Sequence, residues 1–462
     1  MLMSTTAGVT ATSAPTFDNG KLRQASYWVL GGYVAGQILR LASNLILTRL
    51  LAPDLFGLMA VANIVISGVQ MLSDMGIQKN IIQSHSSVSR VFLNTAWVLQ
   101  IFRGFSLAAI VSGFGLILWF IGPSLGSESV YAHQDLPLIF AVLACNLIIS
   151  GFRSTKAAMA NRQLLMGKIT AIELTSQCVA VVAMIILASY SPTVWALVAG
   201  TIISSVFKIS AENIFLPGER NRLQWNNKYA REIFHFGKWI FVTSLLSYWV
   251  LGGDRIILGA NITAHEMGIY SIAIFIVGAV RDGLAAIMHR VFYPVISSCL
   301  REGGDALGVY YRFRLPLDLC VCGLCGFLFV AGDEVISILY DDRYLNAGKF
   351  ITILAVSLLA DRYNGLSIYF LAKGTPRKTI PVTFSRAVML AIGLPLVFAK
   401  FGFFGAVIFL GVYPLLIVPL QLYQKYRAGL LRISSEVAYT VFIFPGLVAG
   451  HLFQWLFTYF VN

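Results

Sequence analysis

Charged residues are scarce in this sequence, since Asp, Glu, Lys and Arg make up only 12% of its 462 residues. A soluble domain carries about 25%. Hydrophobic residues make up 57%, so the chain must use lipid as its solvent. In lipid, only helices and closed barrels satisfy the backbone hydrogen bonds. The apolar runs are ~20 residues long, the length of a membrane-crossing helix rather than of a barrel strand of ~10 residues. The composition therefore predicts an all-α polytopic membrane protein.

Several motifs are also missing. There is no Walker-type phosphate loop, which excludes ATP hydrolysis by this chain, and the six His residues have no metal-ligand spacing. The loops are too short for a soluble catalytic domain. No basic run with interleaved aromatic residues indicates nucleic-acid binding.

Cys322 and Cys325 have redox-motif spacing but lie in an apolar run, so we interpret them as packing residues. Residues 1–20 lack the apolar core of a signal peptide, and we expect a mobile cytoplasmic tail there.

About thirteen apolar runs are long enough to span a membrane. We expect an N-lobe of six spans at 21–216, a cytoplasmic connector at 217–233, a C-lobe of six spans at 234–427, and one further span within 428–462. The predicted spans are 26–50, 54–77, 92–121, 136–158, 166–189, 193–215, 234–258, 266–292, 312–332, 348–372, 379–399, 403–424 and 435–460.

A degenerate repeat supports two lobes. The segment Ile46–Val69 resembles Ile257–Val280 when Gly57 is laid on Gly268. Two six-helix bundles copied in one orientation would be related by a pseudo-two-fold axis along the membrane normal.

The distribution of Lys and Arg predicts the orientation. Most of the loop cations fall in the amino tail and in alternate loops, whereas only Arg49, Arg343, Lys349 and Lys400 fall on the opposite side. Cytoplasmic loops carry the excess of Lys and Arg, so we predict a cytoplasmic amino terminus.

Ionisable residues inside spans cost about 2.5–3.5 kcal/mol each and normally face a hydrated cavity. Arginine suits an anionic substrate because it stays charged and matches phosphate oxygens in paired geometry. The alternative is pairing between helices, since sequence neighbours such as Asp254 and Arg255 point about 100° apart. Lys208 and Glu212 are four residues apart, and we expect them to pair along one helix. The candidate cavity residues are Arg40, Arg103, Arg255, Arg281 and Arg362, and the candidate ion-coupling acids are Asp254, Asp282 and Glu173.

Four segments carry a family resemblance: LTRLLAPDLFGLMAVA from Leu47, Asp74-Met-Gly76, GGDRIILGANITAHEMGIYSIA from Gly252, and LYDDRYLNAGKFITILAV from Leu339. They resemble the polysaccharide-transport branch of the multidrug/oligosaccharidyl-lipid/polysaccharide exporter superfamily, from about Leu22 to Lys425. The chain departs from that pattern at its end, where one span replaces the pair that many relatives carry. We interpret Asp341 and Asp342 as part of a solvated loop rather than as a metal-binding pair.

The resemblance implies a flippase, not an enzyme, in a bacterial inner membrane. It implies two bundles in a V around a central cavity, about 12–14 spans in all, and alternating access. The substrate would be a polyprenyl-diphosphate-linked oligosaccharide, whose diphosphate would meet the five arginines. No cofactor is expected beyond a coupling ion, H⁺ or Na⁺, or the membrane potential. We expect a monomer that contacts membrane lipids and other polysaccharide-assembly proteins. The alternatives are a drug or metabolite cation antiporter of the same superfamily and a membrane glycosyltransferase or polymerase of the same pathway.

Overall fold

The computed structural model describes residues 19–461, except 74–76, 79–80, 82–88, 127 and 164. Most of the predicted tail and the Asp74-Met-Gly76 motif lie outside the described residues. Within them the secondary structure is helical, with no strand. The α-helices are α1 (Asn19–Leu50), α2 (Pro53–Leu72), α4 (Arg90–Ile121), α5 (Leu136–Gly151), α6 (Lys156–Arg162), α7 (Met166–Tyr190), α8 (Val194–Phe215), α9 (Asn227–Gly259), α10 (Ala264–Ile287), α11 (Tyr293–Arg301), α12 (Ala306–Leu339), α13 (Asn346–Ala355), α14 (Leu358–Asp361), α15 (Gly365–Ala372), α16 (Ile380–Val388), α17 (Leu394–Leu416), α18 (Val418–Arg427), α19 (Ile433–Thr440) and α20 (Ile443–Val461). Short helical turns are η2 (Gly122–Ser124), η3 (Val130–Ala132), η5 (Asp342–Tyr344) and η6 (Pro376–Thr379), and η4 (Met288–Phe292) and η7 (Met389–Gly393) are π-helical.

A helix lies within each of the predicted spans, over the residues that the structure describes. In the described part of the chain, eight helical segments are long and apolar enough to cross a membrane, or nine if α5 and α6, bent by 58°, count as one span. The predicted span 348–372 is divided into α13, α14 and α15. The predicted spans 379–399 and 403–424 meet inside α17, which turns at Gly402, where φ is +68°. Glycine occupies this left-handed conformation without the steric penalty that other residues meet.

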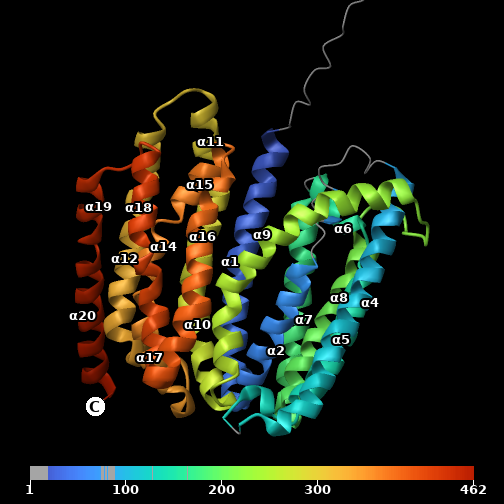
Figure 1. Ribbon diagram of the computed structural model, residues 1–462, viewed down its shortest axis with the longest axis horizontal. Coiled ribbons are helices and arrows are strands. Elements are labelled where there is room, and N and C mark those ends of the chain that lie inside the picture. The colour runs from blue at the N-terminus through green and yellow to red at the C-terminus, as the bar shows by residue number, and fades with distance from the viewer. Residues whose placement is uncertain are drawn as a thin grey trace, which may run out of the picture.

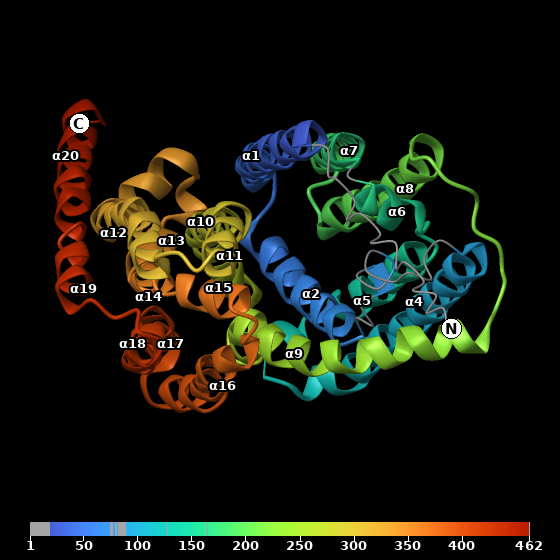
Figure 2. The same ribbon diagram turned by 90° about the horizontal axis from the view of Figure 1, so that it is seen from above.

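The helices form two groups (Figures 1 and 2). One group holds α1, α2 and α4–α8, and the other holds α10–α18, with α19 and α20 at its outer edge. Helix α9 connects the groups, because it packs on α2 and α4 of the first and on α16 and α17 of the second. Figure 1 shows α1 beginning at one end of the molecule and α20 ending at the other. We call the end at which α1 begins the amino face and the opposite end the far face.

Two glycines join the groups near the far face. A Cβ atom on Gly57 of α2 would lie 1.9 Å from the Ala264 carbonyl oxygen at the start of α10. A Cβ atom on Gly268 of α10 would lie 1.9 Å from the Pro53 carbonyl oxygen at the start of α2. Any larger residue would force these helices apart. The two glycines that the sequence repeat aligned therefore lie in the same helix contact.

A loop of the first group also contacts α9 and the loop that joins α9 to α10 at the far face. The backbone N–H of Val130 in η3 donates to the Ile262 carbonyl at 3.1 Å, and the Tyr131 hydroxyl lies 3.3 Å from the Ile256 carbonyl. Burial raises the pKa of Tyr131 above its usual range, so its hydroxyl stays protonated and remains a donor. We call residues 128–133 the N-strap.

The second group returns this contact. In η5, the Tyr344 hydroxyl donates to the Leu51 carbonyl at 3.1 Å, and Arg343 Nη2 donates to the Thr48 carbonyl at 2.9 Å. Asp341 caps η5 and pairs with Arg343, so it orients this contact rather than only facing solvent as we expected. We call residues 340–345 the C-strap. The straps hold the two groups together at the far face from both sides.

Candidate functional site

A pocket of about 710 Å³ lies within the first group, in its half nearer the amino face. We call it the N-lobe pocket. Its lining mixes apolar residues with amide, hydroxyl and cationic groups from α2, α4, α5 and α8 and with one residue of α9. The polar residues of its wall are Ser67, Gln70, Gln78, Gln100, Arg103, Arg153, Ser150, Ser205 and Lys208.

Arg103 on α4 is the predicted cavity residue that the structure places in this pocket. Its Nε donates to Ser73 Oγ at 2.9 Å, and its Nη2 donates to the Gln70 carbonyl at 2.7 Å. These contacts hold the guanidinium against the carboxyl end of α2. The next residue, Gly104, packs against α5, where a Cβ atom would lie 2.9 Å from the Leu147 carbonyl oxygen. This close helix contact sets the depth at which Arg103 enters the pocket.

The predicted Lys208–Glu212 pair is wrong. Lys208 Nζ lies 3.2 Å from Glu173 Oε1 on the neighbouring α7. Glu212 instead receives two hydrogen bonds from Arg153, at 2.7 and 2.5 Å. Cross-helix partners therefore replaced the pairing along α8, and they leave Lys208 and Arg153 in the pocket wall.

A smaller pocket of about 90 Å³ lies in the second group, between α9, α10 and α17. Three of the predicted residues line it together: Asp254, Arg255 and Arg281. Asp254 Oδ2 accepts a hydrogen bond from the Tyr270 hydroxyl at 2.7 Å. In the part of the chain that the structure describes, the Arg255 side chain forms no hydrogen bond or ion pair with protein. We call this the Asp254 pocket, and it contains a cation available to an anionic ligand.

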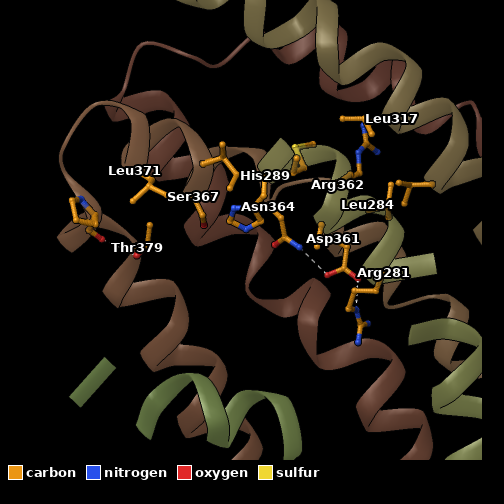
Figure 3. Close-up of a pocket in the computed structure, with 15 residues that line it drawn as sticks. Arg281, Leu284, His289, Leu317, Asp361, Arg362, Asn364, Ser367, Leu371 and Thr379 are labelled. Atoms are coloured by element: carbon orange, nitrogen blue, oxygen red, sulfur yellow. Dashed lines mark hydrogen bonds and ion pairs between the residues drawn. The ribbon is translucent and has the colours of Figure 1, made fainter. Parts of the chain in front are cut away.

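A third pocket, of about 350 Å³, lies between α10, α12, α14 and α15 and is mostly apolar. Figure 3 shows Asp361 at its polar end, between Arg281 and Asn364. Arg281 Nε donates to Asp361 Oδ2 at 2.7 Å and its Nη2 donates to Ser357 Oγ at 2.9 Å, while Asn364 donates to Asp361 Oδ1 at 3.2 Å. We call it the C-lobe pocket.

The three pockets share walls. Leu251 of α9 lines both the N-lobe pocket and the Asp254 pocket. Arg281 of α10 lines both the Asp254 pocket and the C-lobe pocket. The pockets therefore form one row across the molecule, with arginine in each section.

Arg362 contributes to the wall of the C-lobe pocket, but its guanidinium forms hydrogen bonds with residues outside that pocket. It is buried and donates to Asp318 Oδ2 at 3.0 Å and to Thr440 Oγ1 at 2.7 Å. It belongs to a group of buried charges that we call the Arg314 cluster, formed by Arg314, Asp318, Arg362, Lys425 and Glu436. The cluster joins α12, α14, α18 and α19 inside the second group.

The other predicted residues lie outside the three pockets. Arg40 is exposed on α1, and Asp282 is exposed on α10 beside Arg281. Glu173 is about half exposed and pairs with Lys208. The structure thus gathers Arg103, Asp254, Arg255 and Arg281 in the row of pockets and does not bring Arg40, Asp282 or Glu173 there.

Sequence reasoning overlooked several wall residues. Gln70, Gln100 and Ser205 are uncharged, and polar residues of this kind occur in many spans without forming a site. Arg153 was counted with the Lys and Arg of the cytoplasmic side, although it lies near the end of the predicted span 136–158. Side-chain amides are frequent near the amino end of α4 and the carboxyl end of α2. This local density is the sequence signal that could have indicated these residues.

This architecture, with two groups of long apolar helices around polar pockets, defines a multi-pass membrane protein with the fold of two-lobed transporters. The fold is similar to that of a structure described as "Lipid II flippase MurJ, inward closed conformation", with a TM-score of 0.69 and 11% identity over 94% of this chain and 98% of that one. It is also similar to an inward-facing multidrug resistance MATE family transporter, with a TM-score of 0.61 and 13% identity over 91% of this chain and 95% of that one.

The chain belongs to the family described as "Polysaccharide biosynthesis protein", whose model matches residues 46–349. It is 22% identical over 346 residues to the lipopolysaccharide biosynthesis protein WzxC of Escherichia coli (strain K12), covering 72% of this chain. It is 24% identical over 334 residues to the teichuronic acid biosynthesis protein TuaB of Bacillus subtilis (strain 168), covering 71%. The matches span 66% of the length of each of these relatives.

Proposed function

We propose that this protein flips a polyprenyl-diphosphate-linked oligosaccharide across a bacterial cytoplasmic membrane by alternating access, for surface or exopolysaccharide synthesis. The observation that carries the proposal is the row of pockets with an arginine in each, of which Arg255 has no hydrogen-bond or ion-pair partner among the described residues. Arg103 is held at the wall of the N-lobe pocket by its hydrogen bonds to Ser73 and to the Gln70 carbonyl. Family membership and the likeness to a lipid II flippase support the same class of substrate.

The chemistry of the pockets matches the two polar parts of such a substrate. A diphosphate needs positively charged donors, and guanidinium groups form short, charge-assisted hydrogen bonds to its oxygens. A glycan needs neutral donors and acceptors. The Gln70 amide and the side-chain oxygens of Gln100 and Ser205, whose donors bond to backbone carbonyls, line the N-lobe pocket. We assign the diphosphate to the region of Arg103 and Arg255, and the sugar to the amide-lined part of the N-lobe pocket.

The direction of transport follows from charge. Because the loops of the amino face carry most of the Lys and Arg, we assign that face to the cytoplasm. The N-lobe pocket lies in the half nearer this face, where a cytoplasmic substrate would enter. Asp254, hydrogen-bonded to Tyr270 beside the arginines, is the acid we propose for coupling to H⁺ or Na⁺.

The test measures flipping of a lipid-linked oligosaccharide in proteoliposomes, with Arg255→Ala and Arg103→Ala beside the unaltered protein at matched protein density. Removing one charge-assisted contact should slow flipping about tenfold or more. Arg377→Ala is the matched control, because Arg377 is an exposed arginine on the amino face outside the pockets. Its flipping rate should not change.

Undiminished flipping by both pocket variants would remove these residues from the site while leaving the family membership intact. Expulsion of cationic dyes without any lipid flipping would instead support the cation exporter. A glycosyltransferase or polymerase would change the covalent structure of the oligosaccharide, which mass spectrometry of the recovered lipid detects.

A further inference from the structure

The loop between α8 and α9, residues 216–226, is held in place along α4 although it has no regular secondary structure. The buried Asn94 of α4 donates to Gln224 Oε1 at 2.9 Å and accepts from the Arg222 backbone N–H at 3.0 Å. Two further hydrogen bonds, of 2.7 and 2.8 Å, join Asn221 to the turn between α5 and α6. We call these residues the α8–α9 loop. Its position is therefore fixed by buried polar contacts.

The α8–α9 loop lies at the outer edge of the first group, on the side where lipid surrounds the bundle (Figure 2). Helix α4 has 32 residues and is about 48 Å long. The hydrocarbon of a bilayer is ~30 Å thick and covers about 20 residues of a helix. Measured from the far-face end of α4 at Ile121, this thickness ends close to Phe102. The part of α4 that carries the loop therefore extends into the headgroup layer of the amino face.

An apolar anchor lies at the boundary between hydrocarbon and headgroups. The Trp225 ring of the loop lies edge-on to the ring of Phe102, with centroids 6.3 Å apart. Trp225 is 49% exposed, and Leu223 beside it is 79% exposed. Tryptophan is enriched at this depth because its ring is apolar and its N–H is polar. These two side chains are therefore placed to contact lipid.

Three cations accompany this anchor. Arg220, Arg222 and Lys228 are exposed, and their side chains form no ion pair or hydrogen bond with the part of the chain that the structure describes. The acid of the α8–α9 loop, Glu219, is paired with Arg90 at 2.6 Å. The surface thus combines available positive charge with exposed apolar side chains, which is the complement of an anionic lipid.

We propose that this surface binds an anionic glycerophospholipid such as phosphatidylglycerol. Its phosphate contacts Arg220, Arg222 and Lys228, since guanidinium and ammonium groups bind phosphate oxygens through charge-assisted hydrogen bonds. Its acyl chains contact Leu223 and Trp225. Because the loop is already fixed, binding does not require it to become ordered. None of these residues lines one of the three pockets, so the site does not depend on the proposed transport activity.

The test measures the affinity of the detergent-purified full chain for phosphatidylglycerol and for phosphatidylcholine by native mass spectrometry. The first phosphatidylglycerol should bind about tenfold or more tightly than the first phosphatidylcholine, and its binding should weaken as the ionic strength rises. The triple variant Arg220→Gln, Arg222→Gln and Lys228→Gln should lose this preference. An unchanged preference in that variant would overturn the proposal.

The matched control removes three exposed cations from the second group, through Arg301→Gln, Arg312→Gln and Arg377→Gln. It should keep the preference for phosphatidylglycerol. Equal losses in the two triple variants would overturn the proposal and leave only a general attraction between positive charge and anionic lipid. All six positions are exposed, so both variants should melt in lipid-free detergent at the temperature of the unaltered protein.

A competition experiment separates a lipid from a free phosphate. Glycerol 3-phosphate carries the same phosphate chemistry without acyl chains, so at equal concentration it should not displace phosphatidylglycerol. The variant Leu223→Ser with Trp225→Ser should bind phosphatidylglycerol more weakly, because it loses the apolar contacts. Displacement by glycerol 3-phosphate together with full binding by this variant would show a phosphate site and overturn the assignment to lipid.

Discussion

At the scale of single residues, Arg281 shows how a charge is used inside the membrane-crossing region. Its sequence neighbour is Asp282, yet it pairs with Asp361 from another helix. Neighbours on a helix point about 100° apart, so a partner must come from elsewhere. The Asp361 side chain is only 9% exposed, whereas that of Arg281 is 43% exposed and borders two pockets. Asp361 therefore holds Arg281 at the wall between these pockets.

We predict that Asp361→Asn and Arg281→Gln each lower the free energy of unfolding by about 1–2 kcal/mol. This is more than an exposed ion pair contributes and less than a fully buried one. The double variant should lose less than the sum of the two, which a double-mutant cycle on thermal unfolding in detergent measures. Strictly additive effects would show that the pair does not stabilise the fold.

Several residue placements were predictable from the sequence and others were not. A charge inside an apolar run is costly, and that rule identified Arg103, Asp254, Arg255 and Arg281. The rule does not say which helix supplies the partner. It therefore missed the Lys208–Glu173 pair, and it did not anticipate that Arg362 belongs to a buried cluster rather than to a cavity.

At the scale of helices, the last span shows how two apolar helices associate where no hydrophobic force drives them together. Helix α20 packs on α12 through small residues, which allow the backbones to approach closely. A Cβ atom on Gly446 would lie 2.1 Å from the Gly323 carbonyl oxygen, and one on Gly326 would lie 2.4 Å from the Ile443 carbonyl oxygen. Near the far face, Gln454 also donates to Glu334 at 2.7 Å.

We predict that Gly446→Leu separates α20 from α12 and lowers the free energy of unfolding by about 1–3 kcal/mol, as overpacking does in other close contacts. Thermal unfolding in detergent measures the loss. The matched control is Gly113→Leu on α4, because a Cβ atom there meets nothing within 4 Å. A Gly446→Leu protein as stable as this control would show that the glycine contact does not hold the last span.

The extent of the helices was largely predictable, whereas their breaks were not. Long apolar runs indicate spans because each backbone group must be satisfied internally. The division of 348–372 into three helices and the π-turn η4 were not predicted, because hydropathy is averaged over a window and does not mark where a helix breaks or changes its turn. The turn at Gly402 could not be predicted either, because glycine in an apolar chain serves close packing as often as it serves a turn.

At the scale of the whole molecule, the far-face contacts are reciprocal. Gly57 and Gly268 exchange backbone contacts between α2 and α10. The N-strap bonds to α9 and to the α9–α10 loop, and the C-strap bonds to the Leu51 carbonyl between α1 and α2. This reciprocity supports our proposal that the lobes are related by a pseudo-two-fold axis. On the amino face, the Arg290 guanidinium lies 5.0 Å from the centre of the Tyr33 ring. This contact joins η4 to α1 through side chains and does not involve the close backbone packing of the far face. We infer that the far face is closed and must open for release.

This inference predicts that a covalent link across the far face stops transport. Asp54 of α2 and His265 of α10 lie opposite one another, with Oδ2 and Nδ1 3.6 Å apart. In a background without the six native cysteines, Asp54→Cys with His265→Cys, joined by a short thiol-reactive linker, should abolish flipping in proteoliposomes. A cleavable linker should restore it on reduction.

The control is His133→Cys with Asp135→Cys, since this His–Asp pair lies on the same face within one loop, with Nδ1 and Oδ2 3.9 Å apart. Linking that pair constrains no movement between the lobes, so flipping should continue. Continued flipping by the fully linked Asp54 and His265 variant would show that the substrate leaves without the far face parting.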